Sequence, residues 1–256
     1  LSQQYGSPNN ARAYVNSELR IGGVANSTAY NFSGLLDEVR VYEGALTTAQ
    51  INTIMAETHP CIPPAPILEY RFDICSYDAT PGDVFDQTGN FNGSSNGVPS
   101  SSNESIINQS LDLRENNTSD WVSVPSNAID GLNDFSVSVW FKTAVNKNQQ
   151  EILHALGNNT NDDELEIHLR NNNTVVVKVR DVESSLTSSI VLTDDNWHHL
   201  AVAREDQNIC LFIDGAQQTC TTSASAGVLS VTNANAIVIG QEQDQFGGGF
   251  STAQNF

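Results

Sequence analysis

Apolar and polar residues alternate at every second position through most of this chain, and this period constrains the fold more than any other feature. Side chains on a β-strand point to opposite faces in turn, so the period predicts strands. The segments that carry it are 67–73, 136–142, 165–170, 174–180, 199–205, 209–215 and 236–240. Turn-forming clusters at 171–173, 194–196 and 214–215 separate several of them. Many short strands at this spacing predict an all-β antiparallel sandwich or barrel.

The clearest helical period lies at 47–56, which predicts one short helix. Four prolines between residues 60 and 66 predict a stiff, extended connector. We therefore predict three parts. Residues 1–59 form the C-terminal part of a first domain, 60–66 are a Pro-rich linker, and 67–256 form a second domain.

An internal repeat relates residues 19–42 to residues 237–256. Each copy has a hydrophobic strand ending in Ile-Gly, a polar loop and then the pattern Ser-Thr-Ala-x-Asn-Phe. The first copy runs on into a further strand-like segment, and the second stops at Phe256. The repeat predicts tandem copies of one domain, the second without its closing strand. Because the sequence opens at Leu1 with no signal peptide, we expect a mature piece or a fragment.

The charge balance restricts the partners. The chain has 30 Asp and Glu against 11 Lys and Arg, for a formal net charge of −19. Nucleic-acid and anionic-membrane binding rest on basic patches, so the charge argues against both. The sequence also holds no apolar run of about 18 residues that could cross a membrane. An acidic surface fits a secreted or cell-surface protein and suits divalent cations.

The four cysteines fall in two local pairs, Cys61 with Cys75 and Cys210 with Cys220. Such spacing indicates two disulfides and an oxidising compartment; zinc is the alternative, but no C-x-x-C pair supports it. If residues 214–215 form a two-residue hairpin turn, Cys210 and Cys220 face opposite sides of the hairpin. A disulfide there requires an odd-length loop or a β-bulge.

Several segments together resemble a known family. "GLLDEVRVYEGALTTAQI", "FSVSVWFKT", "NWHHLAVAREDQNICLFIDGAQQ" and "EYRFD…DQTGNFNG" are similar to landmarks of laminin-G-like, concanavalin A-like domains. The resemblance covers essentially all of residues 67–256 and the tail of the preceding copy, and it implies a jelly-roll sandwich of two antiparallel sheets. The tandem arrangement also resembles repeats in bacterial surface proteins, such as large proteins encoded with mannose-sensitive haemagglutinin pili.

Within that superfamily, the loop "GQEQDQFGGGF" at 240–250 resembles the calcium loop of pentraxins. The resemblance implies that four residues help to hold paired calcium ions that bind the ligand: Glu242, Gln243, Asp244 and Gln254. Two positions depart from the pattern, because Ser251 replaces a second loop Glu and Gln149-Gln150 replaces an Asp-Asn pair. Gln150 is a further contributor to the predicted site. Fewer carboxylates weaken calcium binding, and a hairpin loop without metal stays open as the alternative.

A second candidate calcium site is "DQTGN" at 86–90, where Asp86 and Asn90 offer oxygens as similar loops do in the family. The alternative is an Asx turn in which Asp86 caps its own backbone, and we favour the turn.

The segment "DDELEIH" at 162–168 raises the question of an enzyme. Glu164, Glu166 and His168 alternate and so share one strand face. Retaining glycosidases need two carboxyl groups about 5–5.5 Å apart, and sandwich-fold glucanases carry an E-x-D-x-x-E strand that is not matched here. We interpret these residues as an exposed polar strand face. For Trp121 and Trp140 we predict burial, with an exposed Trp121 stacking on a sugar as the alternative.

The leading hypothesis is a non-catalytic binding domain of a secreted or cell-surface protein. It would recognise a glycan or an extracellular protein through loops at a sheet edge or face, with calcium as candidate cofactor. The sequence does not identify the ligand-binding residues. A structural spacer without a sugar site is the second hypothesis, and a glucanase-type hydrolase is the third.

Overall fold

A computed structural model describes residues 45–55, 64–97, 99–114, 120–159, 162–222, 224–251 and 253–256. The chain divides into two compact units, Leu1–Pro63 and Pro64–Phe256, and the division falls inside the predicted linker. The first repeat copy at 19–42 and Cys61 lie outside the described residues. Tandem copies and the three-part division therefore stay predictions.

One helix is described in the first unit, α1 (Thr48–Met55), which confirms the helix predicted at 47–56. It begins with a capping box. The backbone N–H of Gln50 donates to Thr47 Oγ1 at 3.3 Å, and the N–H of Thr47 donates to Gln50 Oε1 at 2.8 Å. Among the described residues, no helix is long and apolar enough to span a membrane.

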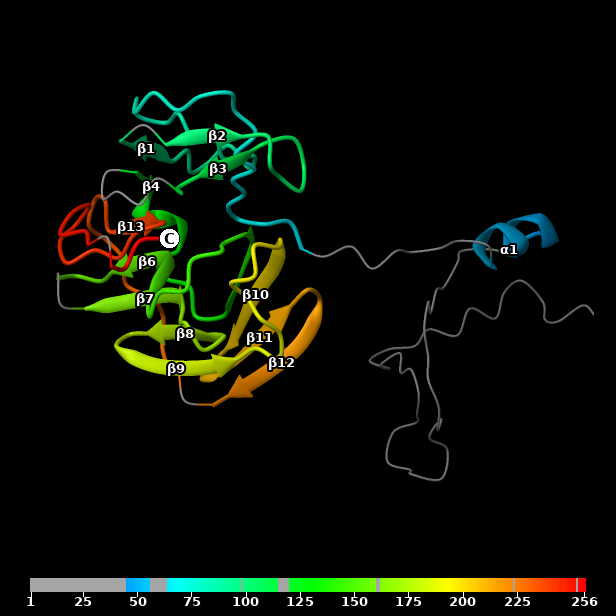
Figure 1. Cartoon of the computed structure of the whole chain (residues 1–256). Helices are drawn as coiled ribbons and strands as arrows, with labels where there is room; N and C mark the ends of the chain where they lie inside the picture. The colour runs from blue at the N-terminus through cyan, green and yellow to red at the C-terminus, as the bar shows by residue number, and fades with distance from the viewer. Residues whose placement is uncertain are drawn as a thin grey trace, which may run out of the picture. The chain divides into compact units, whose positions relative to one another are not determined.

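The second unit is an all-β jelly-roll of two antiparallel sheets (Figure 1). The larger sheet has seven strands, in the order β1 (Ser94–Asn96), β4 (Trp121–Val124), β13 (Ile237–Ile239), β6 (Gln150–Leu156), β7 (Asp163–Leu169), β8 (Thr174–Val179) and β9 (Val182–Thr187). The smaller sheet has the order β12 (Ala216–Thr221), β11 (Asn208–Ile213), β10 (His198–Glu205) and β5 (Phe135–Phe141). Strands β2 (Ser100–Ser102) and β3 (Ser110–Asp112) form a separate pair, and a short 3₁₀ helix spans Ser126–Ala128.

The core lies between the two large sheets and explains the period-two pattern. Strands β10 and β11 alternate strictly between buried and half-buried residues, as the sequence predicts. The buried side chains of the two sheets include Ile167, Val175, Val177, Val179, Leu200, Val202, Leu211 and Ile213. Each aliphatic side chain removed from water contributes about 1.5–3 kcal/mol, so this layer supplies most of the driving force.

The segment 67–73 is not a strand, contrary to the prediction. It makes a single β-bridge, between Tyr70 and Asp86. Phe72 adopts a positive φ of 57°, a conformation that an extended strand does not contain, so pairing stops near Tyr70. Alternation in the sequence is compatible with an extended segment that forms no continuous ladder.

The β11–β12 hairpin confirms the Cys210–Cys220 disulfide together with the bulge that it requires. Asp214 and Gly215 form the two-residue turn, both with positive φ, and Ile213 pairs with Ala216. The register then shifts between Cys210 and Phe212, which brings Cys210 directly opposite Cys220 with their Cα atoms 4.1 Å apart. The bulge turns both side chains to one face. Cys75 is an exposed free thiol, and its predicted partner lies outside the described residues.

Arg204, near the end of β10, is a buried residue that is hydrogen-bonded to several loops. Its side chain is only 3% exposed, and its guanidinium lies 5.7 Å from the ring of Phe135. The guanidinium donates to four backbone carbonyl oxygens at 2.6–2.9 Å, those of Asn133, Asp206, Ser225 and Gly227. Because its donors are matched to fixed carbonyl groups, Arg204 holds three loop segments at one end of the sandwich.

We predict that Arg204→Met lowers the free energy of unfolding by about 2–4 kcal/mol, since it leaves buried carbonyl oxygens without donors. Urea denaturation of both proteins measures the difference. Arg71→Met is the control, because Arg71 is exposed and its ion pair is with the partly exposed Glu69. An Arg204 variant as stable as the Arg71 variant would contradict this role.

Candidate functional site: the loop 240–254 and the polar face of β6 and β7

The loop 240–254 packs against the polar face of the large sheet, the face of β6 and β7 that is turned away from the core. The N–H of Gln243 donates to His154 Nδ1 at 3.0 Å, and the N–H of Glu151 donates to the carbonyl of Gln254 at 3.0 Å. The N–H of Gly240 also donates to the Ile152 carbonyl at 3.1 Å. Both ends of the loop are therefore hydrogen-bonded to β6.

Glycine allows the tight turn within this loop. Gln245 and Gly248 exchange two backbone hydrogen bonds of 2.9–3.1 Å, and Gly247 and Gly249 both have positive φ. A Cβ at Gly249 would lie 2.7 Å from the Cβ of Asp244. Only glycine fits there without displacing Asp244.

Among the predicted calcium ligands, Glu242 has the clearest free oxygen. Its Oε2 is buried and has no hydrogen-bond partner among the residues that the structure describes. Burial raises the pKa of Glu242; His154 opposes that shift, and nearby Asp244 and Glu166 add to it. Asp244 itself is exposed to solvent. A cation beside Glu242 would relieve this desolvated, electronegative environment.

Two other predicted ligands have structural side chains. The amide of Gln243 donates to the Ala236 carbonyl at 2.6 Å and accepts from the N–H of Gly247 at 2.9 Å. Gln150 is fully buried, accepts from Thr143 Oγ1 at 3.0 Å and donates to the Val145 carbonyl at 2.7 Å. These amides hold loops in place. The Gln254 amide makes one long contact, with its Nε2 3.5 Å from Gln149 Oε1.

Beneath the loop lies a cluster that we name the β6–β7 cluster: Glu151, Glu166 and His168. The interpretation of an exposed polar face is wrong for this cluster, because these side chains are at most 3% exposed. His168 Nδ1 lies 2.5 Å from Glu166 Oε1 and 3.7 Å from Glu151 Oε2. The loop 240–254 lies against this face at His154 and Glu151, a contact that a local alternation pattern cannot reveal.

The two carboxylates of the cluster have opposite pKa shifts. Burial raises the pKa of Glu151 well above its usual range, and Glu166 and Glu242 add to the shift. Burial acts on Glu166 in the same direction, but hydrogen bonds from His168 and Lys178 outweigh it and lower its pKa. Within the described part of the chain, Glu151 Oε1 is buried without a hydrogen-bond partner.

A neighbouring group on the same face is satisfied by its own partners. Lys178 Nζ lies 2.6 Å from both Asp163 Oδ2 and Glu166 Oε2. His154 Nδ1 accepts the Gln243 N–H, so Nε2 carries the proton and donates to Asp163 Oδ1 at 3.0 Å. The side chains of this group are therefore hydrogen-bonded or ion-paired with one another without an added ligand.

Glu164 does not form a carboxyl pair with Glu166. Its Oε1 accepts the N–H of Ser230 at 2.7 Å and lies 3.6 Å from Arg180 Nε. The side chain is 2% exposed, so this residue too is buried rather than on an open polar face. The alternation placed the two Glu on one strand correctly, but each carboxylate binds different partners.

The predicted site at 86–90 has the geometry of the Asx-turn alternative. Asp86 is 5% exposed, and its two oxygens accept five hydrogen bonds from the N–H groups of Glu69, Thr88, Asn90 and Phe91 and the hydroxyl of Thr88. Asn90 turns its amide toward Thr88. Donors therefore surround the Asp86 carboxylate.

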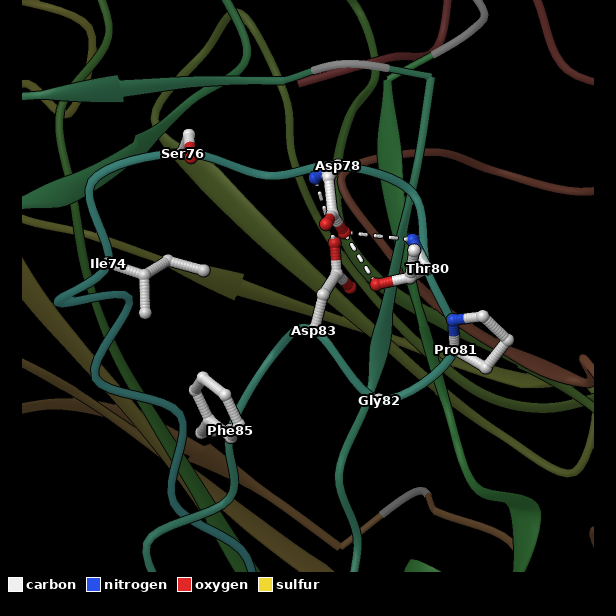
Figure 2. Close-up of a pocket in the computed structure, with 8 residues that line it drawn as sticks. All are labelled: Ile74, Ser76, Asp78, Thr80, Pro81, Gly82, Asp83 and Phe85. Carbon is white, nitrogen blue, oxygen red and sulfur yellow. Dashed lines mark hydrogen bonds between the residues drawn. The ribbon is translucent and has the colours of Figure 1, made fainter.

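A shallow pocket near residues 74–85 also contains carboxylates that accept hydrogen bonds from nearby donors (Figure 2). Asp78 accepts from the N–H and hydroxyl of Thr80, and Asp83 accepts from the N–H of Asp78 (Figure 2). Phe85, 56% exposed, lies at its rim. Asp78 caps a turn of its own segment, and Asp83 also accepts from the N–H and hydroxyl of Ser95 on β1, which argues for a structural role.

The outward face of the small sheet carries an unexpected aromatic residue. Trp140 is 48% exposed, so the prediction that it is buried is wrong. It pairs across strands with His199, and the two rings lie 5.1 Å apart. Ser138, Ala201 and Phe212 lie on the same outward face of the small sheet. We call the surface formed by these three residues with Trp140 and His199 the aromatic face. Trp121 is buried against Phe250, as predicted.

Sequence reasoning missed Glu151 and Trp140 as exceptional positions. Glu151 opens a strand between Gln150 and Ile152, where a charged residue resembles an ordinary outward position. Val137 and Val139 face the core, and Trp140 follows Val139 directly. The period of two therefore places the Trp140 side chain on the outward face of the sheet. Aromatic character favours burial of Trp140, whereas the period-two pattern indicates exposure, and the period is the correct guide here.

The Asp86 geometry predicts a pH-dependent contribution to stability. Burial works to raise the pKa of Asp86, but the hydrogen bonds from Thr88 and the backbone outweigh it and hold the pKa well below the usual range. The stabilisation is therefore present above the unfolded-state pKa of about 3.9 and is lost as the pH falls through the folded-state value.

We predict that Asp86→Asn costs about 2 kcal/mol at pH 7, with the difference from wild type shrinking below about pH 4. Chemical denaturation at pH 3, 5 and 7 measures it. Asp195→Asn is the control, because Asp195 is exposed and lies on a turn that Asn also tolerates. A difference that grows in acid would contradict the turn assignment.

Comparison with known proteins places this geometry in a family. No curated protein sequence matches the chain. Among solved structures, a SAP-like pentraxin from Limulus polyphemus is 18% identical to this chain with a TM-score of 0.42. The match covers 50% of this chain and 60% of the pentraxin chain. Domain 4 of the extracellular arabinanase AbnA from Geobacillus stearothermophilus, solved with arabinotriose, is 20% identical with a TM-score of 0.43, covering 60% and 76%.

The CBM40 module of a Ruminococcus gnavus sialidase, solved with α2,3-sialyllactose, is 13% identical with a TM-score of 0.38, covering 44% and 66%. This chain thus spans less than two thirds of the pentraxin and of the sialidase module. Residues 116–253, more than half of the chain, match a family described as the concanavalin A-like lectin/glucanases superfamily. The chain belongs to the concanavalin A-like lectin/glucanases superfamily.

Proposed function

We propose that residues 64–256 form a non-catalytic carbohydrate-binding domain that holds a glycan on the aromatic face. The observation that carries this proposal is the exposure of Trp140, which is 48% accessible on a sheet face and lies against His199. An exposed tryptophan beside a second ring is costly to leave in water, and it offers a flat apolar surface with polar atoms at its edge. Sugar rings present matching apolar faces and hydroxyl groups.

The neighbours of Trp140 suit such a ligand. Ser138 and Ala201 pair across strands, and Ala201 also pairs with Phe212 on the other side. Ser138 is beside Trp140 on the same face of β5, and Ala201 lies on β10 between the strands of Trp140 and Phe212. Because both side chains are small, a ring stacked on Trp140 meets little steric hindrance. The Ser138 hydroxyl and the His199 imidazole supply hydrogen-bonding groups beside it.

Calcium is the proposed cofactor of the loop 240–254. Oxygens of Glu242, Asp244 and Gln254 would hold it, and the partnerless Oε2 of Glu242 supports this assignment. When bound, the ion would supply positive charge and cross-link the loop. The side chains of Gln150 and Gln243 do not fit this role, because their amides are already hydrogen-bonded.

A non-catalytic role is supported by the different partners of Glu164 and Glu166 on β7. Glu164 binds Ser230 and Glu166 binds His168, so the pair offers no acid and nucleophile to one substrate atom. The Cys210–Cys220 disulfide supports an extracellular location.

The test is a glycan array with the full chain, including arabinan- and sialic acid-bearing glycans, followed by titration calorimetry on the best ligand. Trp140→Ala should weaken binding about tenfold or more, because one stacked ring contributes roughly 1.4 kcal/mol. Phe85→Ala is the matched control, since it removes another exposed aromatic residue far along the chain. Absence of any reproducible glycan, or equal loss in both variants, would contradict the proposal and favour a spacer.

Calcium binding is tested separately by melting temperature. We expect calcium to raise the melting temperature of the wild type and to have no effect on Glu242→Gln, because ligand binding to the folded state stabilises it. Glu183→Gln, at a partly exposed carboxylate of β9, is the control that should behave as wild type. A calcium response that survives Glu242→Gln would remove this residue from the site.

A further inference from the structure

We propose that the β6–β7 cluster, Glu151, Glu166 and His168, is a binding site for a divalent transition-metal cation of the zinc class. The site is separate from the proposed glycan surface, which lies on the other sheet, and it uses none of the residues predicted as calcium ligands.

The strand register brings the three ligands together. Glu151 on β6 pairs directly with His168 on β7, and Glu166 lies two residues before His168 on the same face. One oxygen or nitrogen atom from each residue lies within 4.8 Å of the others. Ligand atoms at 2.0–2.2 Å from a tetrahedral zinc ion are separated by roughly 3.3–3.6 Å. The His168–Glu151 separation of 3.7 Å is near that value, and the His168–Glu166 contact of 2.5 Å needs to open slightly.

An unsatisfied oxygen points to a missing partner. Glu151 is fully buried, and among the described residues no donor reaches its Oε1, the neighbour of the Oε2 that faces His168. Its other oxygen receives only a long contact, 3.4 Å from Gln149 Nε2. A carboxylate buried with so little compensation is costly, and natural proteins pair such groups with cations or metals.

Gln149 marks where positive charge is favoured. Its Nε2 lies 3.4 Å from Glu151 Oε2 and 3.2 Å from Glu166 Oε1, so an amide N–H₂ bridges the two carboxylates. The Gln149 side chain is only half-buried, unlike the three ligands. Rotation of this side chain would give a cation access to both carboxylate oxygens.

The neighbouring group on this face explains why the cation would select these residues. His154, Asp163 and Glu166 also lie within 4.8 Å of one another, but Lys178 and the Gln243 N–H satisfy that group. Lys178 binds Oε2 of Glu166 and thereby directs Oε1 toward His168. Outer partners of this kind orient metal ligands.

The donor set selects the class of metal. An imidazole nitrogen with two carboxylates is typical of zinc and other first-row transition ions, whereas calcium prefers six to eight oxygens. Three protein ligands leave a fourth position for a water molecule.

The test uses the full chain stripped of metal with a chelator and titrated calorimetrically with zinc chloride, and in parallel with calcium chloride. We expect one equivalent of zinc to bind and to raise the melting temperature. Glu151→Gln and His168→Gln should each weaken zinc binding by at least about 100-fold, since even outer-shell changes cost 10–100-fold. Glu151→Gln removes a buried, partnerless charge, so this variant is expected to fold without metal.

His199→Gln is the matched control, because it removes a histidine on the other sheet and should leave zinc affinity unchanged. Glu242→Gln should likewise retain zinc binding while losing the calcium response, so failure of one proposal is distinguishable from failure of the other. Cobalt(II) gives a second readout, with visible absorption that should disappear in His168→Gln. No zinc binding by the wild type, or undiminished binding by Glu151→Gln and His168→Gln, would overturn the proposal.

Discussion

The contact on which the site depends is the packing of loop 240–254 over the polar face of β6 and β7. A hydrogen bond from the Gln243 N–H to His154, and another from the Glu151 N–H to the Gln254 carbonyl, join the loop to the sheet. Without this cover, Glu151 and Glu166 would be ordinary solvated carboxylates on a strand. With it, they lie in a medium of low dielectric, where each charge needs a partner.

Much of the fold could be predicted from the sequence because the information is local. Period-two alternation identified the central strands of both sheets, and the turn clusters identified where they end. The Cys210–Cys220 pair even required a bulge, which the β11–β12 register contains. The strand prediction for 67–73 is wrong. The alternation of apolar and polar residues is present there, but the positive φ of Phe72 prevents continuous strand pairing.

The candidate site was less predictable, because burial of a strand's second face depends on a segment nearly ninety residues away in sequence. The alternation predicts that Glu166 and His168 share one strand face, but it does not reveal that this face is buried. Gln150 and Gln243 occupy positions that resemble calcium ligands, yet their amides satisfy backbone groups. Residue type predicted which atoms could bind a cation, whereas only the tertiary contacts show which atoms lack a partner.

The tautomer of His154 tests the loop–sheet contact most directly. A backbone N–H can only donate, so His154 Nδ1 must be unprotonated if it accepts from Gln243. Nitrogen-15 NMR of the histidine side chains at pH 7 distinguishes the two ring nitrogens. The account predicts a proton on Nε2 and slow exchange of the Gln243 amide proton. A proton on Nδ1, or rapid exchange of that amide, would contradict it.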